Sequence, residues 1–174
     1  MQQRGASDEC VRRAPFGIGY APPTMPFEFA GATDVGRKRD HNEDSLLLLP
    51  EHRVAVVCDG MGGHEAGEVA SGIGVDTVKR FFEIANFQHK NVITRALGMA
   101  EQTEVDVSAW DLEPGDVCVV CCDGLTGMLT DDRIAEVIAG EPELQKACQQ
   151  LIDEANGNGG VDNITVALAR FKPA

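Results

Sequence analysis

The chain has 174 residues, a mass of 18.6 kDa, 43% hydrophobic residues and a formal net charge of −13. This length favours one domain with its own hydrophobic core, and the apolar fraction argues against overall disorder. The acidic excess argues against nucleic acid as a partner, because like charges repel. In an enzyme that handles phosphate, it would leave metal ions to carry the positive charge.

Six cysteines are present, which is compatible with disulfides only in an oxidising compartment. The N-terminus shows no signal peptide, and the longest aliphatic block near it, Leu46–Leu49, is too short to span a membrane. We therefore expect a cytoplasmic chain with reduced thiols. Cys118 and Cys121 form a C-x-x-C pair that leaves zinc binding open. Residues three apart in a strand point to opposite faces, so we favour core packing for both.

The first half of the chain predicts a tail, three strands and a long helix. Residues 1–26 hold four prolines and no periodic pattern, and predict an irregular tail. Strands are expected over 27–33, 43–49 and 54–58, and a helix over 65–84. Its apolar stripe is expected to face the core through Val69, Ile73, Val78, Phe81 and Phe82. Gly72 and Gly74 inside this helix indicate close packing.

The second half predicts a mixture of helices and strands. Further strands are expected over 104–110, 117–122 and 164–170. Helices are expected over 92–97, from a cap at Thr130, and over 143–155, followed by a glycine-rich loop over 156–160. The six strands and four helices do not alternate strictly, so the predicted class is α+β, with antiparallel sheets covered by helices. We place one domain over 27–174.

Two apolar strands end in the same way, as VAVVCDGMG over 54–62 and VCVVCCDGLTG over 117–127. Each delivers an aspartate, Asp59 or Asp123, followed by a glycine that lets the backbone approach closely. Two more acidic positions stand beside strands: Glu43 and Asp44 before one, and Asp162 with Asn163 before another. We expect these acids to meet on one rim of the fold. Cys58 and Cys122 should face away from the aspartates that follow them.

Carboxylates and backbone carbonyls are ligands suited to Mg²⁺ or Mn²⁺. Two such ions can activate a water and hold a phosphoryl group in line. Arg37, Lys38 and Arg39 supply complementary charge, since an arginine fork matches phosphate. His41 or His64 could protonate a leaving alkoxide or orient a water. Each feature alone has an ordinary explanation as a turn or a solvated surface, but together they favour one site.

Five motifs occur in the order typical of one family. They are TDVGRKRDHNEDS over 33–45, CDGMGGHEAGEVAS over 58–71, ITRALG over 93–98, CDGLTG over 122–127 and DNITV over 162–166. The sequence resembles the metal-dependent protein phosphatases, the type 2C serine/threonine phosphatases, in their bacterial branch. The resemblance covers nearly everything from Phe29 to Phe171, and it implies a β-sandwich flanked by helices with a centre of two Mn²⁺ or Mg²⁺ ions.

The resemblance also implies roles for single residues. Asp59 would bridge both ions and Gly60 would lend its carbonyl, while Asp123 and Asp162 would complete the shell of the first ion. Glu43 and Asp44 would hold ion-bound waters. Arg39 would bind the substrate phosphate, and Asn163 would support Asp162 beside the substrate. The implied partners are proteins phosphorylated on serine or threonine by a kinase; neither nucleic acid nor membrane is expected.

One block typical of the family is missing from the sequence. The strands that carry Met-Gly-Thr-Thr and Gly-Asp-Ser-Arg are absent, with the junction near 87–88. A deletion in the gene, a deliberate shortening and an incomplete sequence are all consistent with this gap, and intact mass would reveal an incomplete sequence. Sheet edges should then be left unpaired. Two alternatives to an active phosphatase therefore stay open: an inactive pseudophosphatase that binds metal or a phosphoprotein, and a fragment that does not fold alone.

Overall fold

The computed structural model describes residues 27–61, 65–84 and 108–172. The predicted tail, the predicted helix over 92–97 and the junction near 87–88 lie outside these residues. The described elements are β1 (Phe27–Asp34), β2 (Ser45–Leu49), the 3₁₀ helix η1 (Pro50–His52), β3 (Val54–Cys58), α1 (Glu65–Ile84), β4 (Val117–Cys121), α2 (Asp123–Thr126), α3 (Asp131–Gly140), α4 (Leu144–Gly157) and β5 (Ile164–Phe171).

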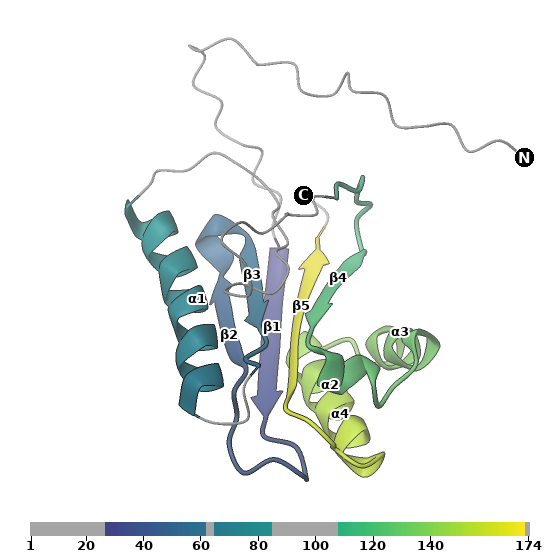
Figure 1. Ribbon diagram of the computed structural model, residues 1–174. Coiled ribbons are helices and arrows are strands. Elements are labelled where there is room, and N and C mark those ends of the chain that lie inside the picture. Colours follow the sequence, from purple (N-terminus) through teal and green to yellow (C-terminus); the bar gives the residue numbers. More distant parts are fainter. Residues whose placement is uncertain (1–26, 62–64, 85–107, 173–174) are drawn as a thin grey trace, which may run out of the picture.

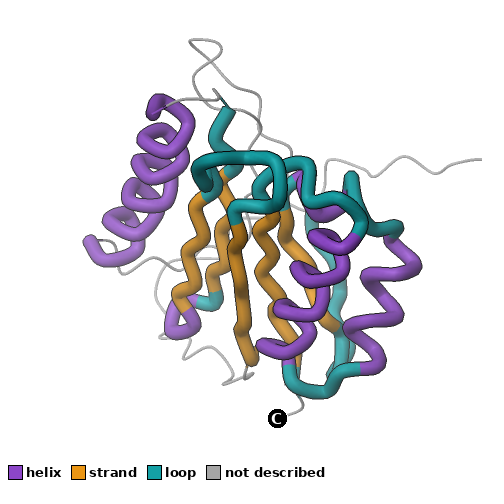
Figure 2. Tube along the Cα trace, turned by 90° about the horizontal axis from the view of Figure 1, so that it is seen from below, coloured by secondary structure: helices purple, strands orange, loops and turns teal. Residues whose placement is uncertain are grey.

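The elements form two antiparallel sheets between helices. One sheet has the order β1-β5-β4, and the other pairs β2 with β3. The sheets contact each other through β1 with β2 and through β3 with β5, while α1 covers β2 and β3 and α4 covers β1 and β5. Figures 1 and 2 show α1 on one side of the strands and α3 and α4 on the other. The predicted α+β class with a helix-flanked sandwich is confirmed.

The strongest core lies between the three-stranded sheet and α3 and α4. β5 is its central strand, and its residues Ile164–Leu168 are all buried because helices cover one face and the second sheet covers the other. The side chains that α4 buries follow helical spacing: Leu144, Ala147, Cys148, Leu151, Ile152 and Ala155. Burial of this stripe, rather than helix propensity alone, holds α4 against the sheet.

The two sheets are in close contact at Gly31 of β1. A Cβ atom placed there would lie 2.8 Å from Leu46 Cδ2 and 3.2 Å from the Val166 carbonyl oxygen. A larger side chain would therefore push β2 away from the β1–β5 pair. The strands β2 and β3 are mostly half-buried, because they form a sheet of only two strands among the described residues.

The predicted orientation of α1 is wrong at three positions. Val69, Ile73 and Phe81 are 58%, 61% and 49% exposed, although they were expected to face the core. The helix instead buries Gly67 and Ser71. A small-residue face lets the helix backbone come close to the strands, which outweighs burial of the larger apolar face.

Local details of the remaining elements agree in part with the prediction. Close packing is present at Gly74, where a Cβ would lie 3.1 Å from Cys58 Sγ, but not at Gly72, which faces open space. Thr130 caps α3 by accepting a 3.3 Å hydrogen bond from the Arg133 amide. Asp123, expected in a turn, begins α2.

Other boundaries differ from the expected ones. Helix α4 runs to Gly157, two residues into the predicted loop, and the backbone of 108–110 has no regular structure where a strand was expected. The five described cysteines are free thiols. Among the helices that the structure describes, none is both long and apolar enough to cross a membrane.

Candidate functional site

Four aspartates from four separate segments meet at one end of the sandwich. Asp59 follows β3, and Asp123 follows β4, which contacts β3 across the two sheets. Asp44 precedes β2 and Asp162 precedes β5. Each of Asp44 and Asp59 feels the negative charge of Asp123 and Asp162, and Asp59 also feels that of Asp44. The acids that the sequence pointed to therefore form one cluster, which we call the aspartate cluster.

This crowding raises the pKa of Asp59 to about 6. Partial desolvation is the largest cause, followed by repulsion from Asp44, Asp123 and Asp162 and by a hydrogen bond with Asp123. Desolvation also raises the pKa of Asp44, while hydrogen bonds from Thr165 and Cys122 oppose the rise. A group of like charges held this close together favours a cation among them.

Glu43 and Gly60 form the wall of the cluster toward α1. Glu43 is buried, and its carbonyl accepts a 2.5 Å hydrogen bond from Ser71 Oγ. A Cβ at Gly60 would overlap the carbonyl oxygens of Glu43 and Gly67. A Cβ at Gly67 would lie 2.7 Å from Glu43 Oε2, so the first turns of α1 press directly on this side chain. Gly60 leaves no room for a Cβ because the overlap is with backbone, whereas a Cβ at Gly67 would require the Glu43 side chain to move.

Arg39 lies at the edge of the aspartate cluster. Its Nη2 donates to Asp162 Oδ2 at 2.7 Å, and both side chains are partly exposed. The loop that carries it is tied to the loop before β5, because the Arg37 amide donates to the Gly160 carbonyl at 2.7 Å. Gly36, at φ +82°, sits where a Cβ would overlap the Asp162 carbonyl oxygen. The predicted phosphate ligand is thus close to the predicted metal ligands.

Asn163 joins this loop to β5. Its Nδ2 donates to the carbonyls of Val35 and His41, both at 2.9 Å, and its Oδ1 accepts from the Glu43 amide at 2.8 Å. The side chain is buried. Both of its side-chain protons are committed within the chain, which leaves no donor for a substrate. The geometry agrees with a supporting role next to Asp162 and gives no support to substrate contact by Asn163.

Cys122, expected to face away from the aspartate that follows it, lies beside Asp44 of the cluster. Its buried thiol donates to the Asn163 carbonyl at 3.3 Å and accepts from the Thr165 amide at 3.1 Å. Burial and the neighbouring Asp44 carboxylate raise the pKa of this thiol to about 12. Cys122 follows β4 and reaches Asp44, which comes from a distant segment. Cys58 does face away, toward Gly74 of α1.

Sequence reasoning also missed the polar groups around Asp44. Thr165 Oγ1 donates to Asp44 Oδ2 at 2.6 Å, and it lies 2.7 Å from Thr33 Oγ1 on the paired strand. Thr33 accepts in turn from Asn42 Nδ2 at 2.8 Å. The available signal was Thr165 inside the DNITV motif, but the partner on β1 follows only from the strand register.

Of the two histidines predicted as general acids, the structure describes only His41. His41 is exposed, and only its backbone carbonyl has a described hydrogen bond, from Asn163. His64 lies outside the described residues. The choice between them as a general acid stays a prediction.

The donors of the aspartate cluster fit Mg²⁺ or Mn²⁺ by chemical type. They are carboxylates with a backbone carbonyl, and their mutual repulsion is visible in the raised pKa of Asp59. Over the ranges 27–61, 65–84 and 108–172, however, no three histidine, cysteine or acidic side chains stand together in a ready-made ligand arrangement. An ion would have to draw the carboxylates inward, and Asp162 would have to share its oxygens with Arg39.

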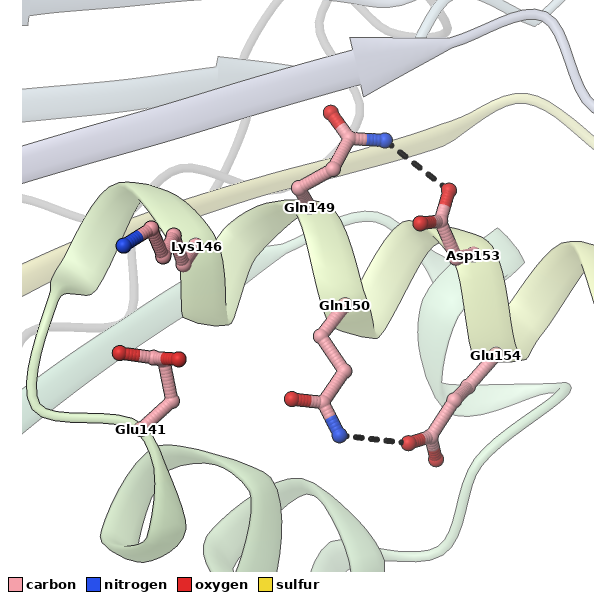
Figure 3. Close-up of a pocket in the computed structure, with 6 residues that line it drawn as sticks. All are labelled: Glu141, Lys146, Gln149, Gln150, Asp153 and Glu154. Carbon is pink, nitrogen blue, oxygen red and sulfur yellow. Dashed lines mark hydrogen bonds between the residues drawn. The ribbon is translucent and has the colours of Figure 1, made fainter.

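A hollow of about 390 Å³ opens next to the cluster. It is lined by Asp123, Gly124, Thr126, Gly127, Met128, Val161 and Asp162. A second hollow, of about 430 Å³, lies over α4 (Figure 3) and is lined by Glu141, Lys146, Gln149, Gln150, Asp153 and Glu154. There Gln149 donates to Asp153 at 3.0 Å and Gln150 to Glu154 at 2.9 Å, and Glu154 also accepts from Arg133 at 2.8 Å, so both carboxylates already have partners within the chain. The aspartate cluster, with the hollow beside it that Asp123 and Asp162 line, is the candidate functional site.

Comparisons with known proteins point to one family. The family model described as stage II sporulation protein E (SpoIIE) matches residues 85–172, which is half of the chain. A Streptococcus pyogenes protein that bears the name of a 2C-type protein phosphatase is 42% identical over 86 residues, 49% of this chain and 35% of that protein. The serine/threonine phosphatase stp of Listeria monocytogenes is 36% identical over 83 residues, 48% of this chain and 33% of its own length.

The matched part is therefore about a third of the length of these curated relatives. Among solved structures, the catalytic domain of the serine/threonine protein phosphatase PstP, in complex with two manganese ions, is similar with a TM-score of 0.71. That similarity covers 86% of this chain and 100% of the PstP chain at 20% identity, and so it shows the fold. The chain belongs to the SpoIIE and 2C-type phosphatase family, in its bacterial branch.

Proposed function

We propose that the chain hydrolyses phosphoserine and phosphothreonine in proteins with the help of two Mn²⁺ or Mg²⁺ ions. The observation that carries the proposal is the meeting of Asp44, Asp59, Asp123 and Asp162 from four segments, with Arg39 at their edge. The relatives' names supply the reaction class. The two manganese ions bound by PstP support the choice of metal.

The ions would be held by Asp59, Asp123 and Asp162, with the Gly60 carbonyl, and Glu43 and Asp44 would face their water shell. When bound, such ions lower the pKa of a water and neutralise phosphoryl charge. The carboxylates of the chain would position the attacking water toward the phosphorus, and no phosphoenzyme would form. His41 or His64 would give a proton to the departing serine or threonine oxygen.

Arg39 would bind the phosphate through its guanidinium fork. In the described structure this group is paired with Asp162 at 2.7 Å. An ion pair this open to solvent contributes only about 0–1 kcal/mol, so exchanging the carboxylate for phosphate costs little. The hollow beside Asp123 and Asp162 leaves space for the residue that carries the phosphate.

The test is release of phosphate from a phosphothreonine peptide with and without Mn²⁺. We expect Mn²⁺-dependent hydrolysis by the wild-type protein and loss of at least about 100-fold in kcat for Asp123→Asn, since loss of charge stabilisation at one position costs roughly that much. Asp153→Asn, the same change at the hollow over α4, serves as the matched control. A wild-type rate that does not respond to Mn²⁺, or an Asp123→Asn variant as active as the control, would refute the proposal.

A second candidate is a pseudophosphatase that binds metal or a phosphoprotein without turnover. The ion pair between Arg39 and Asp162 favours it, because this pair occupies groups that catalysis would need separately. Calorimetry that shows Mn²⁺ binding, together with no hydrolysis at any Mn²⁺ concentration, would select this function over the first.

A further inference from the structure

Asp44 stands in a closed ring of hydrogen bonds that begins and ends on itself. Its own amide donates to Asn42 Oδ1 at 3.1 Å, and Asn42 Nδ2 donates to Thr33 Oγ1 at 2.8 Å. Thr33 and Thr165 are joined by their hydroxyls at 2.7 Å, and Thr165 donates to Asp44 Oδ2 at 2.6 Å. The ring connects the loop before β2 with the neighbouring strands β1 and β5.

The direction of every proton in the ring is fixed by chemistry. A backbone amide only donates, so the atom of Asn42 that faces Asp44 is its oxygen, and the atom that faces Thr33 is its nitrogen. Thr165 has one hydroxyl proton, and Asp44 receives it. Thr33 must therefore donate to Thr165. Donors that each receive a hydrogen bond themselves polarise one another, which strengthens the last bond to the carboxylate.

The ring is built on the rigid part of the fold. Thr33 and Thr165 are directly opposite in the register of β1 and β5, and Thr165 is fully buried in the central strand. The Thr165 amide also holds the Cys122 thiol, which reaches the same carboxylate. Residues of the sheet thus hold the Asp44 carboxylate in place, while its charge interacts with those of Asp59, Asp123 and Asp162.

We propose that Thr165, supported by Thr33 and Asn42, is a positioning residue that fixes the Asp44 carboxylate toward the divalent cations of the site. The inference rests on the proposed function, because it concerns the same cluster. Removal of outer-shell groups at a metal site commonly changes metal affinity by about 10–100-fold. Thr165 does not touch the substrate or the ions, and acts only through Asp44.

The test measures Mn²⁺ affinity by calorimetry without substrate, and then the dependence of hydrolysis on Mn²⁺. Thr165→Val keeps the shape and removes the hydroxyl, whereas Thr165→Ser keeps the hydroxyl. We expect Thr165→Val to weaken Mn²⁺ binding by about tenfold or more. It should also raise the Mn²⁺ concentration needed for half-maximal rate, with kcat recovering at saturating Mn²⁺. Thr165→Ser should stay near the wild type.

Two further variants separate positioning from general stability. Ile152→Val lowers stability in the core on the α4 side of the sheet and should leave Mn²⁺ affinity unchanged. Thr33→Val removes the hydroxyl that bonds to Thr165, at an exposed position. If Thr165→Val does not fold, Thr33→Val tests the same hypothesis. It should weaken Mn²⁺ binding in the same direction.

The outcomes distinguish this inference from the proposed function. Wild-type affinity in Thr165→Val and Thr33→Val, or failure of Thr165→Ser to restore binding, would overturn the positioning role and leave the phosphatase proposal standing. If Thr165→Val and Thr33→Val weaken Mn²⁺ binding but the wild type hydrolyses no substrate, the positioning role would be supported and the catalytic proposal refuted. No Mn²⁺ binding by the wild type would overturn both.

Discussion

Replacing Asp59 by asparagine should stabilise the metal-free protein at neutral pH. The pKa of Asp59 is raised from 3.8 to about 6 by desolvation and by its acidic neighbours. Below pH 3.8 both the folded and the unfolded chain hold the proton, and stability is unaffected. As pH rises toward 6, the unfolded chain gives up the proton first, so the folded state loses stability. The whole penalty is present above about pH 6, and asparagine removes it.

The size of the effect follows from the shift. A rise of this extent corresponds to at most about 3 kcal/mol, at roughly 1.4 kcal/mol per pKa unit. The side chain is still exposed to solvent, and screening reduces the expected gain to about 1 kcal/mol. At about pH 5 roughly half of the penalty has developed, so the gain should be about half as large there.

The assay is urea unfolding of wild type and Asp59→Asn at about pH 5 and pH 7.5, with a chelator to remove divalent cations. Asp76→Asn, at an exposed carboxylate on α1, is the matched control for loss of one negative charge outside the cluster. An Asp59→Asn variant that is equally stable with the wild type at both pH values would refute the reasoning. So would a gain larger at pH 5 than at pH 7.5.

Three further predictions concern packing and charge elsewhere in the fold. Leu151→Ala, at a fully buried position of α4, should cost about 2–5 kcal/mol in urea unfolding; a cost below about 1 kcal/mol would contradict the core described between α4 and β5. Gly124→Ala would overlap the Asn163 carbonyl and should cost about 1–3 kcal/mol, whereas Gly140→Ala, which faces open space, should be tolerated in the same measurement. The third concerns Arg133, which forms ion pairs with Glu136 and Glu154. The Arg133 guanidinium lowers the pKa of Glu154 from 4.5 to about 2. The Arg133–Glu154 pair therefore adds stability above pH 4.5, and this stability is lost as pH falls toward 2. Glu154→Gln should therefore lower the thermal midpoint at pH 7 and match the wild type near pH 2, and a deficit independent of pH would point to lost packing instead.

The aspartates could be found from the sequence because each follows or precedes an apolar strand. Asp59 comes directly after β3 and Asp123 comes two residues after β4, so the two strands bring these aspartates to one end of the fold. The helices of the second half were also within reach, since α4 shows helical spacing and Thr130 caps α3. Each of these features depends only on residues that are close together in the sequence, so the sequence alone can reveal it.

Contacts between distant segments could not be predicted in this way. The orientation of α1 depends on how closely Gly67 and Gly74 approach the strands, and the apolar pattern of the helix pointed to another face. The hydrogen bond between Thr33 and Thr165 depends on the register of β1 and β5, which no residue of either strand specifies alone. The pair of Arg39 with Asp162 likewise joins two loops that meet only in the folded chain.

Because β5 is the central strand of its sheet, its register determines both the packing of the core and the position of the site residues. Asp162, Asn163 and Thr165 enter the site from one short stretch, while Ile164 and Val166 are buried in the body of the fold. A slip of one residue would bring Ile164 or Val166 to the place that Thr165 occupies, because neighbouring strand residues face opposite sides. The buried side chains of β5 thereby fix the register of the strand and, with it, the position of the site residues. Any substitution that shifts the register of this strand would displace Asp162, Asn163 and Thr165 together.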